Sequence, residues 1–170
     1  MSLLRNKLLW VALVCIAPLV LGTAVYLLGW SPGAPSNYGE LIPPRVISLN
    51  EFRGKWVLVT FDAGACDAYC ERKLYIMRQV RRAQGKEMDR IERLWVLTDA
   101  GKPRAEALAA SEGTRIGRNE NLAAAFPGPA RDHIYVVDPL GNLMMRFPRD
   151  PDPSRVIKDL QRLLKYSRFG

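Results

Sequence analysis

FDAGACDAYC, residues 61–70, is the stretch of sequence that decides the fold. The residues before it, Lys55–Thr60, form an apolar run typical of a buried strand, and the residues after it, 71–83, have the periodicity of an amphipathic helix. Cys66 and Cys70 therefore lie where a strand passes into a helix. At such a place the unpaired backbone N–H groups and the positive end of the helix dipole lower the pKa of a cysteine thiol.

The spacing of the two cysteines adds to this. Residues four apart lie on one face of a helix, so the sulfur atoms of Cys66 and Cys70 can converge. Two converging thiols either form a disulfide or hold a soft metal ion. The alternative is that both are small apolar core residues, since free cysteines are often simply buried. Their position at a strand-to-helix junction favours a disulfide or a metal site over this alternative.

The composition limits the classes of function. The chain has 170 residues, enough for one domain with additional segments, and its formal net charge is +8. Its Lys and Arg residues are scattered and form no recognition motif, so nucleic-acid binding is not expected, and a setting beside anionic lipid headgroups fits better. Cys15, the third cysteine, lies in the apolar N-terminal segment, so the domain has one cysteine pair and is not a disulfide scaffold.

The N-terminal segment predicts a membrane anchor. Residues Leu8–Trp30 carry no charge, and at 1.5 Å per residue they span about 34 Å as a helix, enough for a bilayer core. The basic residues Arg5 and Lys7 precede this run, which predicts a cytoplasmic N-terminus and a periplasmic C-terminal domain on a single-pass inner-membrane protein.

The alternative is a cleaved signal peptide. The apolar run is longer than a signal core of about 7–15 residues and contains only a weak cleavage motif, so an uncleaved anchor is favoured. Cys15 suggests a lipoprotein, but Val14 before it is too bulky for that signal. In either case Cys66 and Cys70 face an oxidising compartment.

The rest of the chain predicts one α/β domain. We expect residues 1–30 to be the cytoplasmic tip and transmembrane anchor, residues 31–45 a Pro- and Gly-rich linker, and residues 46–170 the domain. Strands are predicted at 46–49, 55–60, 91–98, 134–138 and 143–147. Helices are predicted at 71–83, 104–110 and 155–166, and residues 111–119 are expected to be irregular. This order, with two cysteines after the first central strand, is that of a thioredoxin-like three-layer sandwich.

His133 is the sole histidine, and it enters the predicted strand 134–138 directly after Asp132. The alternative for such a residue is an exposed loop histidine. Together with the thiolates of Cys66 and Cys70, however, it completes a plausible three-coordinate site of the kind that selects Cu(I). Zinc usually takes a fourth ligand.

These features resemble the SCO/SenC family of cytochrome c oxidase assembly factors. The resemblance rests on the N-terminal anchor, on Gly54–Phe61 leading into a Cys-x-x-x-Cys motif, on Asp132-His133, and on the Asp-Pro-x-Gly turn within Val137–Asn142. It implies a thioredoxin-like domain that faces the periplasm. It also implies copper bound by Cys66, Cys70 and His133. The implied partner is the oxidase subunit that carries the CuA centre, or another copper or thiol assembly factor.

The chain departs from that family around its cysteines. Asp67 and Glu71 replace the usual proline after each cysteine, and Ala63–Ala65 replaces an aromatic-Thr-His sequence. The chain is therefore identified as a divergent member. A carboxylate beside each of Cys66 and Cys70 would raise the thiol pKa values and favour a bound cation.

Two other functions stay open. One is a thiol–disulfide oxidoreductase of the same fold, in which Cys66 and Cys70 are the catalytic redox pair. Such enzymes commonly use Cys-x-x-Cys, so the third intervening residue here favours a metal. The other is a non-catalytic assembly scaffold whose cysteines form a structural disulfide.

Two further groups of side chains have simpler interpretations. Met144 and Met145 offer thioethers to copper, but alternation along a strand predicts that they point to opposite faces, with at least one in the core. Within the 71–83 helix, Lys73 and the arginines fall between apolar positions. The arginines, which are Arg72, Arg78, Arg81 and Arg82, are interpreted as a solvated face, with docking of an acidic partner as the alternative.

Overall fold

The computed structural model describes residues 2–29, 37–119 and 121–167. The chain divides into two compact units, Met1–Ser36 and Asn37–Gly170, which are considered separately. The expected linker at residues 31–45 lies partly outside the described residues.

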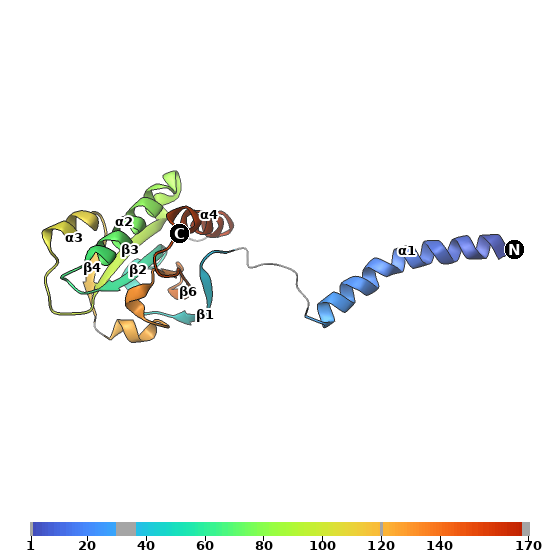
Figure 1. Cartoon of the computed structure of the whole chain (residues 1–170), viewed down its shortest axis with the longest axis horizontal. Coiled ribbons are helices and arrows are strands. Elements are labelled where there is room, and N and C mark those ends of the chain that lie inside the picture. Colours follow the sequence, from blue (N-terminus) through green and yellow to red (C-terminus); the bar gives the residue numbers. More distant parts are fainter. Residues whose placement is uncertain (1, 30–36, 120, 168–170) are drawn as a thin grey trace. The chain divides into compact units, whose positions relative to one another are not determined.

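The first unit contains helix α1 (Ser2–Leu27; Figure 1). Within it, Leu9–Leu27 is long and apolar enough to cross a membrane, with a mean hydropathy of 2.2. Pro18 lies inside the helix, which membrane helices tolerate. The chain therefore has one candidate membrane anchor among its described residues.

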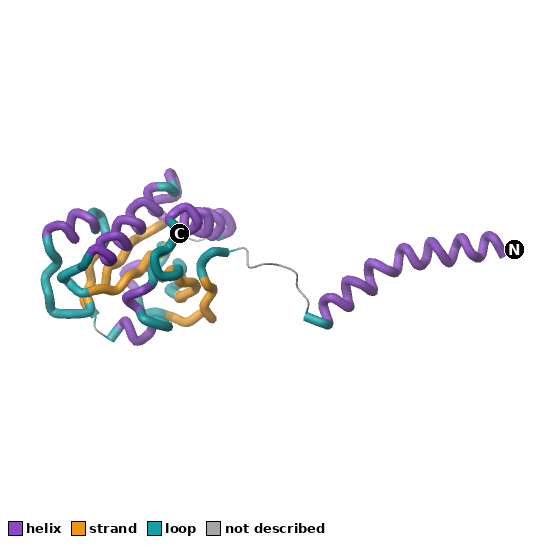
Figure 2. The backbone as a smooth tube through the Cα atoms, in the orientation of Figure 1, coloured by secondary structure: helices purple, strands orange, loops and turns teal. Residues whose placement is uncertain are grey.

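The second unit is built on a six-stranded mixed sheet with the strand order β1-β6-β5-β2-β3-β4 (Figure 2). Central strand β2 pairs parallel with β3 and antiparallel with β5. Every residue of β2 is buried, which explains the apolar run Trp56–Val59 at its beginning. The strands are β1 (Glu40–Val46), β2 (Trp56–Asp62), β3 (Ile91–Leu97), β4 (Arg115–Arg118), β5 (Tyr135–Val137) and β6 (Asn142–Arg146).

Helices cover one face of this sheet. Helix α2 (Ala68–Arg82) and helix α4 (Pro153–Tyr166) lie on this face (Figure 1). Their apolar side chains form one cluster with Trp56 and Leu58 of β2. Short helix α3 (Ala105–Ala110) contributes Ala107 to a second cluster around the cysteines.

Short 3-10 segments cover the other face, which carries Val57, Val59 and Phe61 of β2. The segments η1 (Asn50–Phe52) and η3 (Leu122–Ala125) pack there, so the second covering layer consists of 3-10 turns and loops. Two more 3-10 segments are η2 (Gly85–Arg90) and η4 (Ala130–Asp132). The expected thioredoxin-like α/β fold is confirmed.

Three segments differ from the sequence-based expectation. Residues 40–45, expected as part of the linker, form most of β1, and residues 115–118, expected to be irregular, form β4. Residues 47–49, expected to continue a strand from Val46, lie outside the sheet. Both strands lie at sheet edges, where Pro43 and Pro44 need not donate to a neighbour. The pairing of β1 with β6 shifts register between Leu41 and Arg45, around these prolines. The domain therefore begins before residue 46.

Candidate functional site

Cys66 and Cys70 form a disulfide at the beginning of α2, with 5.2 Å between their Cα atoms. The convergence expected from their spacing is thus present. Asp67 caps the helix by accepting a hydrogen bond from Cys70 N at 3.0 Å. Cys66 lies in the loop before the cap, with a φ of 38° in the left-handed region.

The disulfide is buried. Cys66 is 1% exposed and Cys70 is 0% exposed, and both pack against apolar side chains that include Leu74, Trp95 and Leu97. Thiol–disulfide exchange requires a thiolate to reach one of the sulfur atoms. An external thiol can therefore attack this disulfide only after the surrounding loop has opened.

Arg104, directly before α3, fastens that loop. Its guanidinium donates hydrogen bonds to the carbonyl oxygens of Ala65 and Cys66 and to Glu71 Oε1, the last at 3.0 Å. The backbones also meet closely, since a Cβ on Gly64 would lie 2.7 Å from the carbonyl group of Gly101. The loop after β3 thus holds the cysteine loop closed, and no sequence pattern indicated this.

The two carboxylates beside the cysteines are both paired with arginines. Asp67 Oδ2 lies 2.5 Å from Arg131 Nη2, and Glu71 pairs with Arg104. The hydrogen bond from Cys70 N, followed by that from Arg131, lowers the pKa of Asp67. These two negative charges are therefore compensated locally by arginines.

A buried ion pair joins the end of β2 to α2, close to the cysteines. Lys73 Nζ is 3.1 Å from Asp62 Oδ2, and each side chain is 1% exposed. Lys73 also donates to the carbonyl oxygens of Phe61 and Arg131, so it joins the end of β2 to the segment before β5. Burial lowers the pKa of Lys73, and the charge of Asp62 opposes that shift.

The sequence interpretation missed this pair. Asp62 ends an apolar strand, and a charged residue at that position is a signal that could have been used. Arg131 adds a second positive charge, with Nε 3.0 Å from Asp62 Oδ1. The segment that carries His133 is therefore tied to the cysteine end of α2 by ionic contacts.

His133 lies between η4 and β5, two residues before the strand begins, and is half-buried. Its Nδ1 is 2.7 Å from the carbonyl oxygen of Phe147. A carbonyl oxygen only accepts, so neutral His133 carries its proton on Nδ1 and keeps a lone pair on Nε2. Asp132, its neighbour, accepts a hydrogen bond from the hydroxyl of Tyr69 at 2.9 Å, which places this segment beside the first turn of α2.

The disulfide form does not bring the three expected ligands together. Within residues 2–29, 37–119 and 121–167, no group of three or more His, Cys, Asp or Glu side chains is placed to hold a metal ion. The site formed by Cys66, Cys70 and His133 stays a prediction, and it concerns the reduced protein.

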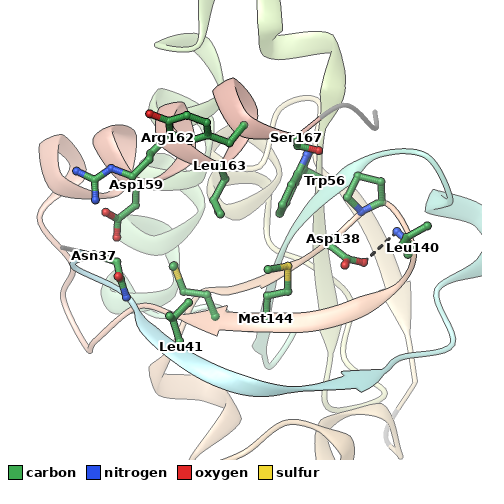
Figure 3. Close-up of a pocket in the computed structure, with 13 residues that line it drawn as sticks. Asn37, Leu41, Trp56, Asp138, Leu140, Met144, Asp159, Arg162, Leu163 and Ser167 are labelled. Atoms are coloured by element: carbon green, nitrogen blue, oxygen red, sulfur yellow. Dashed lines mark hydrogen bonds between the residues drawn. The ribbon is translucent and has the colours of Figure 1, made fainter. Parts of the chain in front are cut away.

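An apolar pocket of about 460 Å³ lies elsewhere in the domain, between the β1–β6 edge and α4 (Figure 3). Leu163 of α4 faces Leu41 and Met144 on the strands. Met145 lines it too, contrary to the expected alternation. A one-residue β-bulge explains this, because Val136 pairs with Met145 whereas Val137 pairs with Leu143.

Comparisons with known proteins agree with this architecture. Residues 56–167 match the family model described as transmembrane-like, thioredoxin-like, C-terminal domain. No curated protein matches the sequence.

Several solved structures are similar in fold. Copper-bound yeast Sco1 has a TM-score of 0.58 and 15% identity, over 79% of this chain and 96% of that one. Copper-bound ScoI of Bradyrhizobium japonicum has a TM-score of 0.52 and 19% identity, over 73% and 98%. A putative protein disulfide isomerase of Bacteroides thetaiotaomicron has a TM-score of 0.50 and 17% identity, over 76% and 91%. The resemblance to SCO proteins is confirmed, and at these identities it establishes the fold.

Proposed function

The chain belongs to the transmembrane-like, thioredoxin-like, C-terminal domain family, and from this premise we propose that it is a membrane-anchored copper-binding protein. Cys66 and Cys70 act as a reversible thiol pair. The reduced pair and His133 bind Cu(I) as cargo for the CuA centre of cytochrome c oxidase. The partner is the oxidase subunit that carries CuA, or another copper or thiol assembly factor.

The hydrogen bond from His133 Nδ1 to Phe147 O, 2.7 Å long, carries this proposal. Histidines that bind metals almost always donate their other ring N–H to a carboxylate or a backbone carbonyl, which fixes the tautomer and orients the lone pair. His133 has this arrangement in the disulfide form, before any metal binds. Two thiolates and one imidazole are a donor set that suits Cu(I).

Contacts around the site support the participation of Cys70. Tyr69, the residue before Cys70, is hydrogen-bonded to Asp132, the residue before His133. Lys73, one turn further along α2, is hydrogen-bonded to Arg131 O. These contacts hold the segment before His133 against the first turns of α2, next to Cys70.

Copper loading requires reduction first. Two electrons and two protons from a dithiol reductant convert the Cys66–Cys70 disulfide to two thiols, and the reductant becomes a disulfide. Cu(I) then displaces the thiol protons, since cysteine binds metals as thiolate. The redox state of the pair thus determines whether copper binds.

The proposed location is the inner membrane. Arg5 and Lys7 lie on the N-terminal side of the apolar helix, which predicts a cytoplasmic N-terminus and a periplasmic domain. This places the cysteine pair in a compartment where disulfides persist unless a dedicated thiol reductant acts on them.

The test is a Cu(I) competition titration of the reduced full-length protein in a non-ionic detergent. The wild type is expected to bind one Cu(I), Cys66→Ser to lose tight binding, and His133→Ala to bind at least about tenfold more weakly. Met88→Ala, on the exposed η2 segment, is the matched control and should not change the affinity. Absence of binding by the wild type, or an unchanged affinity in His133→Ala, would contradict the proposal.

The burial of both sulfur atoms favours a second candidate, a scaffold with a structural disulfide. In that case replacing both cysteines lowers the free energy of unfolding. In the folded protein the disulfide then resists reduction by a glutathione buffer. A disulfide that equilibrates readily with that buffer, in a protein that does not bind Cu(I), would instead indicate a thiol–disulfide oxidoreductase.

A further inference from the structure

Arg93, in the middle of β3, is buried under α2 with incomplete hydrogen bonding. The residue is 4% exposed, and its Nη2 donates to Glu112 O at 2.7 Å. Its Nε and Nη1 atoms are also buried and have no partner among the described residues. Buried guanidinium groups are normally paired, because an unpaired buried charge is strongly unfavourable.

The surroundings of Arg93 are positive. Burial, followed by the charges of Arg81, Arg78 and Arg82, lowers the pKa of Arg93 to about 10, so the group stays charged at neutral pH. Arg78 lies over the same region, and its buried Nε atom also has no partner among the described residues. Three N–H-bearing atoms of two arginines are therefore left without an acceptor.

Among the described residues, Glu112 is the carboxylate paired with Arg78 and Arg82, and the charge of Glu92 only partly opposes the lowering of the Arg93 pKa. Glu112 Oε2 lies 3.4 Å from Arg78 Nη1 and 3.7 Å from Arg82 Nη2, and the Glu112 side chain is 70% exposed. Arg81 pairs instead with Asp89, at 3.5 Å, and donates to Ile91 O. Arg78 and Arg82 thus share one exposed carboxylate, and Arg93 contacts the backbone oxygen of the same residue, Glu112.

We propose that Arg78, Arg82 and Arg93 form a binding site for a phosphate-type oxyanion. Tetrahedral oxyanions accept hydrogen bonds along the planar edge of a guanidinium group, with charge assistance. Such an anion satisfies the unpaired N–H groups and neutralises the cluster. Glu112 occupies the entrance and competes with the anion for Arg78 and Arg82.

The loop between α3 and β4 closes the site from one side. Gly113 adopts a φ of 71°, and a Cβ at this position would lie 2.9 Å from Arg93 Nη2. The backbone of Gly113 thus packs directly on the Arg93 guanidinium. On our proposal an anion enters from the other side, where the Glu112 side chain lies. The phosphate group can belong to a free anion or to a lipid headgroup, and the chemistry of recognition is the same.

The experiment is thermal unfolding of the full-length protein in a non-ionic detergent, with inorganic phosphate compared with chloride at equal ionic strength. At phosphate about tenfold above its Kd, the wild-type Tm is expected to rise by about 5 °C relative to chloride. Arg93→Met should abolish this difference. Arg72→Met, which removes an arginine from the same helix outside the cluster, should keep it.

Two variants at exposed positions keep the test valid if Arg93→Met does not fold. Arg82→Gln should weaken phosphate binding, whereas Glu112→Gln should strengthen it by removing the competing carboxylate. Absence of a phosphate-specific rise in the wild type would overturn the site, as would an unchanged rise in both Arg93→Met and Arg82→Gln.

A second arm distinguishes the two sources of phosphate. Vesicles of phosphatidylcholine with phosphatidic acid should displace bound phosphate from the wild type, but not vesicles of phosphatidylcholine alone, if the ligand is a headgroup. Phosphate binding that neither kind of vesicle affects assigns the site to a free anion. Either result depends on the same three arginines.

Discussion

The two ends of α2 handle buried charge in opposite ways. Near the cysteines, Asp62, Lys73 and Arg131 form a compact set in which each charge has an opposite partner. One to two turns further along, Arg78 lies near Arg93 of β3, and both carry N–H groups that have no partner within residues 2–29, 37–119 and 121–167. At the first end the charges are balanced, although Asp62 Oδ2 contacts Lys73 only as an ion pair, without a hydrogen bond, whereas the second end is short of negative charge.

The difference separates charges that stabilise the fold, at Asp62, Lys73 and Arg131, from charges that we propose bind an anion. A buried ion pair with all its hydrogen bonds made is close to neutral for stability, but removal of one partner leaves an uncompensated charge. Lys73 therefore has a structural task, to hold the His133 segment against the cysteine end of α2. Arg93 has no comparable task in the domain, and its unpaired groups point to a bound anion.

The largest effect should come from breaking the buried Asp62–Lys73 ion pair. Lys73→Met leaves Asp62 buried with only the half-exposed Arg131 as a partner, which should lower the free energy of unfolding by about 3 kcal/mol. Urea denaturation measures this, with Arg72→Met, whose ion pair is exposed, as the control. A loss no larger than in Arg72→Met would mean that the Asp62–Lys73 pair is not structural.

A smaller effect is expected when the hydrogen bonds from Arg104 to the cysteine loop are removed. Arg104→Gln removes the charged hydrogen bonds to the carbonyl oxygens of Ala65 and Cys66, so the disulfide should be reduced by dithiothreitol about tenfold faster. Arg118→Gln is the control, because Arg118 donates to the Ala100 and Gly101 carbonyl oxygens of the same covering loop but not to the cysteine loop. Equal rates in the two variants would show that Arg104 does not limit access.

The smallest effect concerns Asp67, whose folded-state pKa is lowered from 3.8. A carboxyl with a lowered folded pKa contributes stability that is present above its unfolded pKa and is lost as the pH falls through the folded pKa. Asp67→Asn keeps a good helix cap but removes the charge. Unfolding free energies measured from pH 6 to 2 should therefore converge for wild type and variant at the acidic end. Parallel curves would refute the assignment.

Much of the fold was predictable from local sequence. The apolar run of β2, the amphipathic periodicity of α2 and α4, and the position of Cys66 and Cys70 between a strand and a helix identified a thioredoxin-like domain. Edge strand β1 escaped prediction because Pro43 and Pro44 suggest a linker unless a partner strand is known. That Met144 and Met145 line the same pocket also escaped prediction, because the bulge responsible arises only when β5 pairs with β6.

The sequence alone identified the candidate features: one cysteine pair at a helix beginning, one histidine near a strand entrance, and one apolar N-terminal run. Only the tertiary structure decided their state. It buried the disulfide under Arg104, fixed the tautomer of His133 through Phe147 O, and paired Lys73 with Asp62 while leaving Arg93 incompletely paired. The physical reason is that periodicity and propensity act over a few neighbouring residues, whereas burial and charge compensation depend on groups brought together from distant parts of the chain.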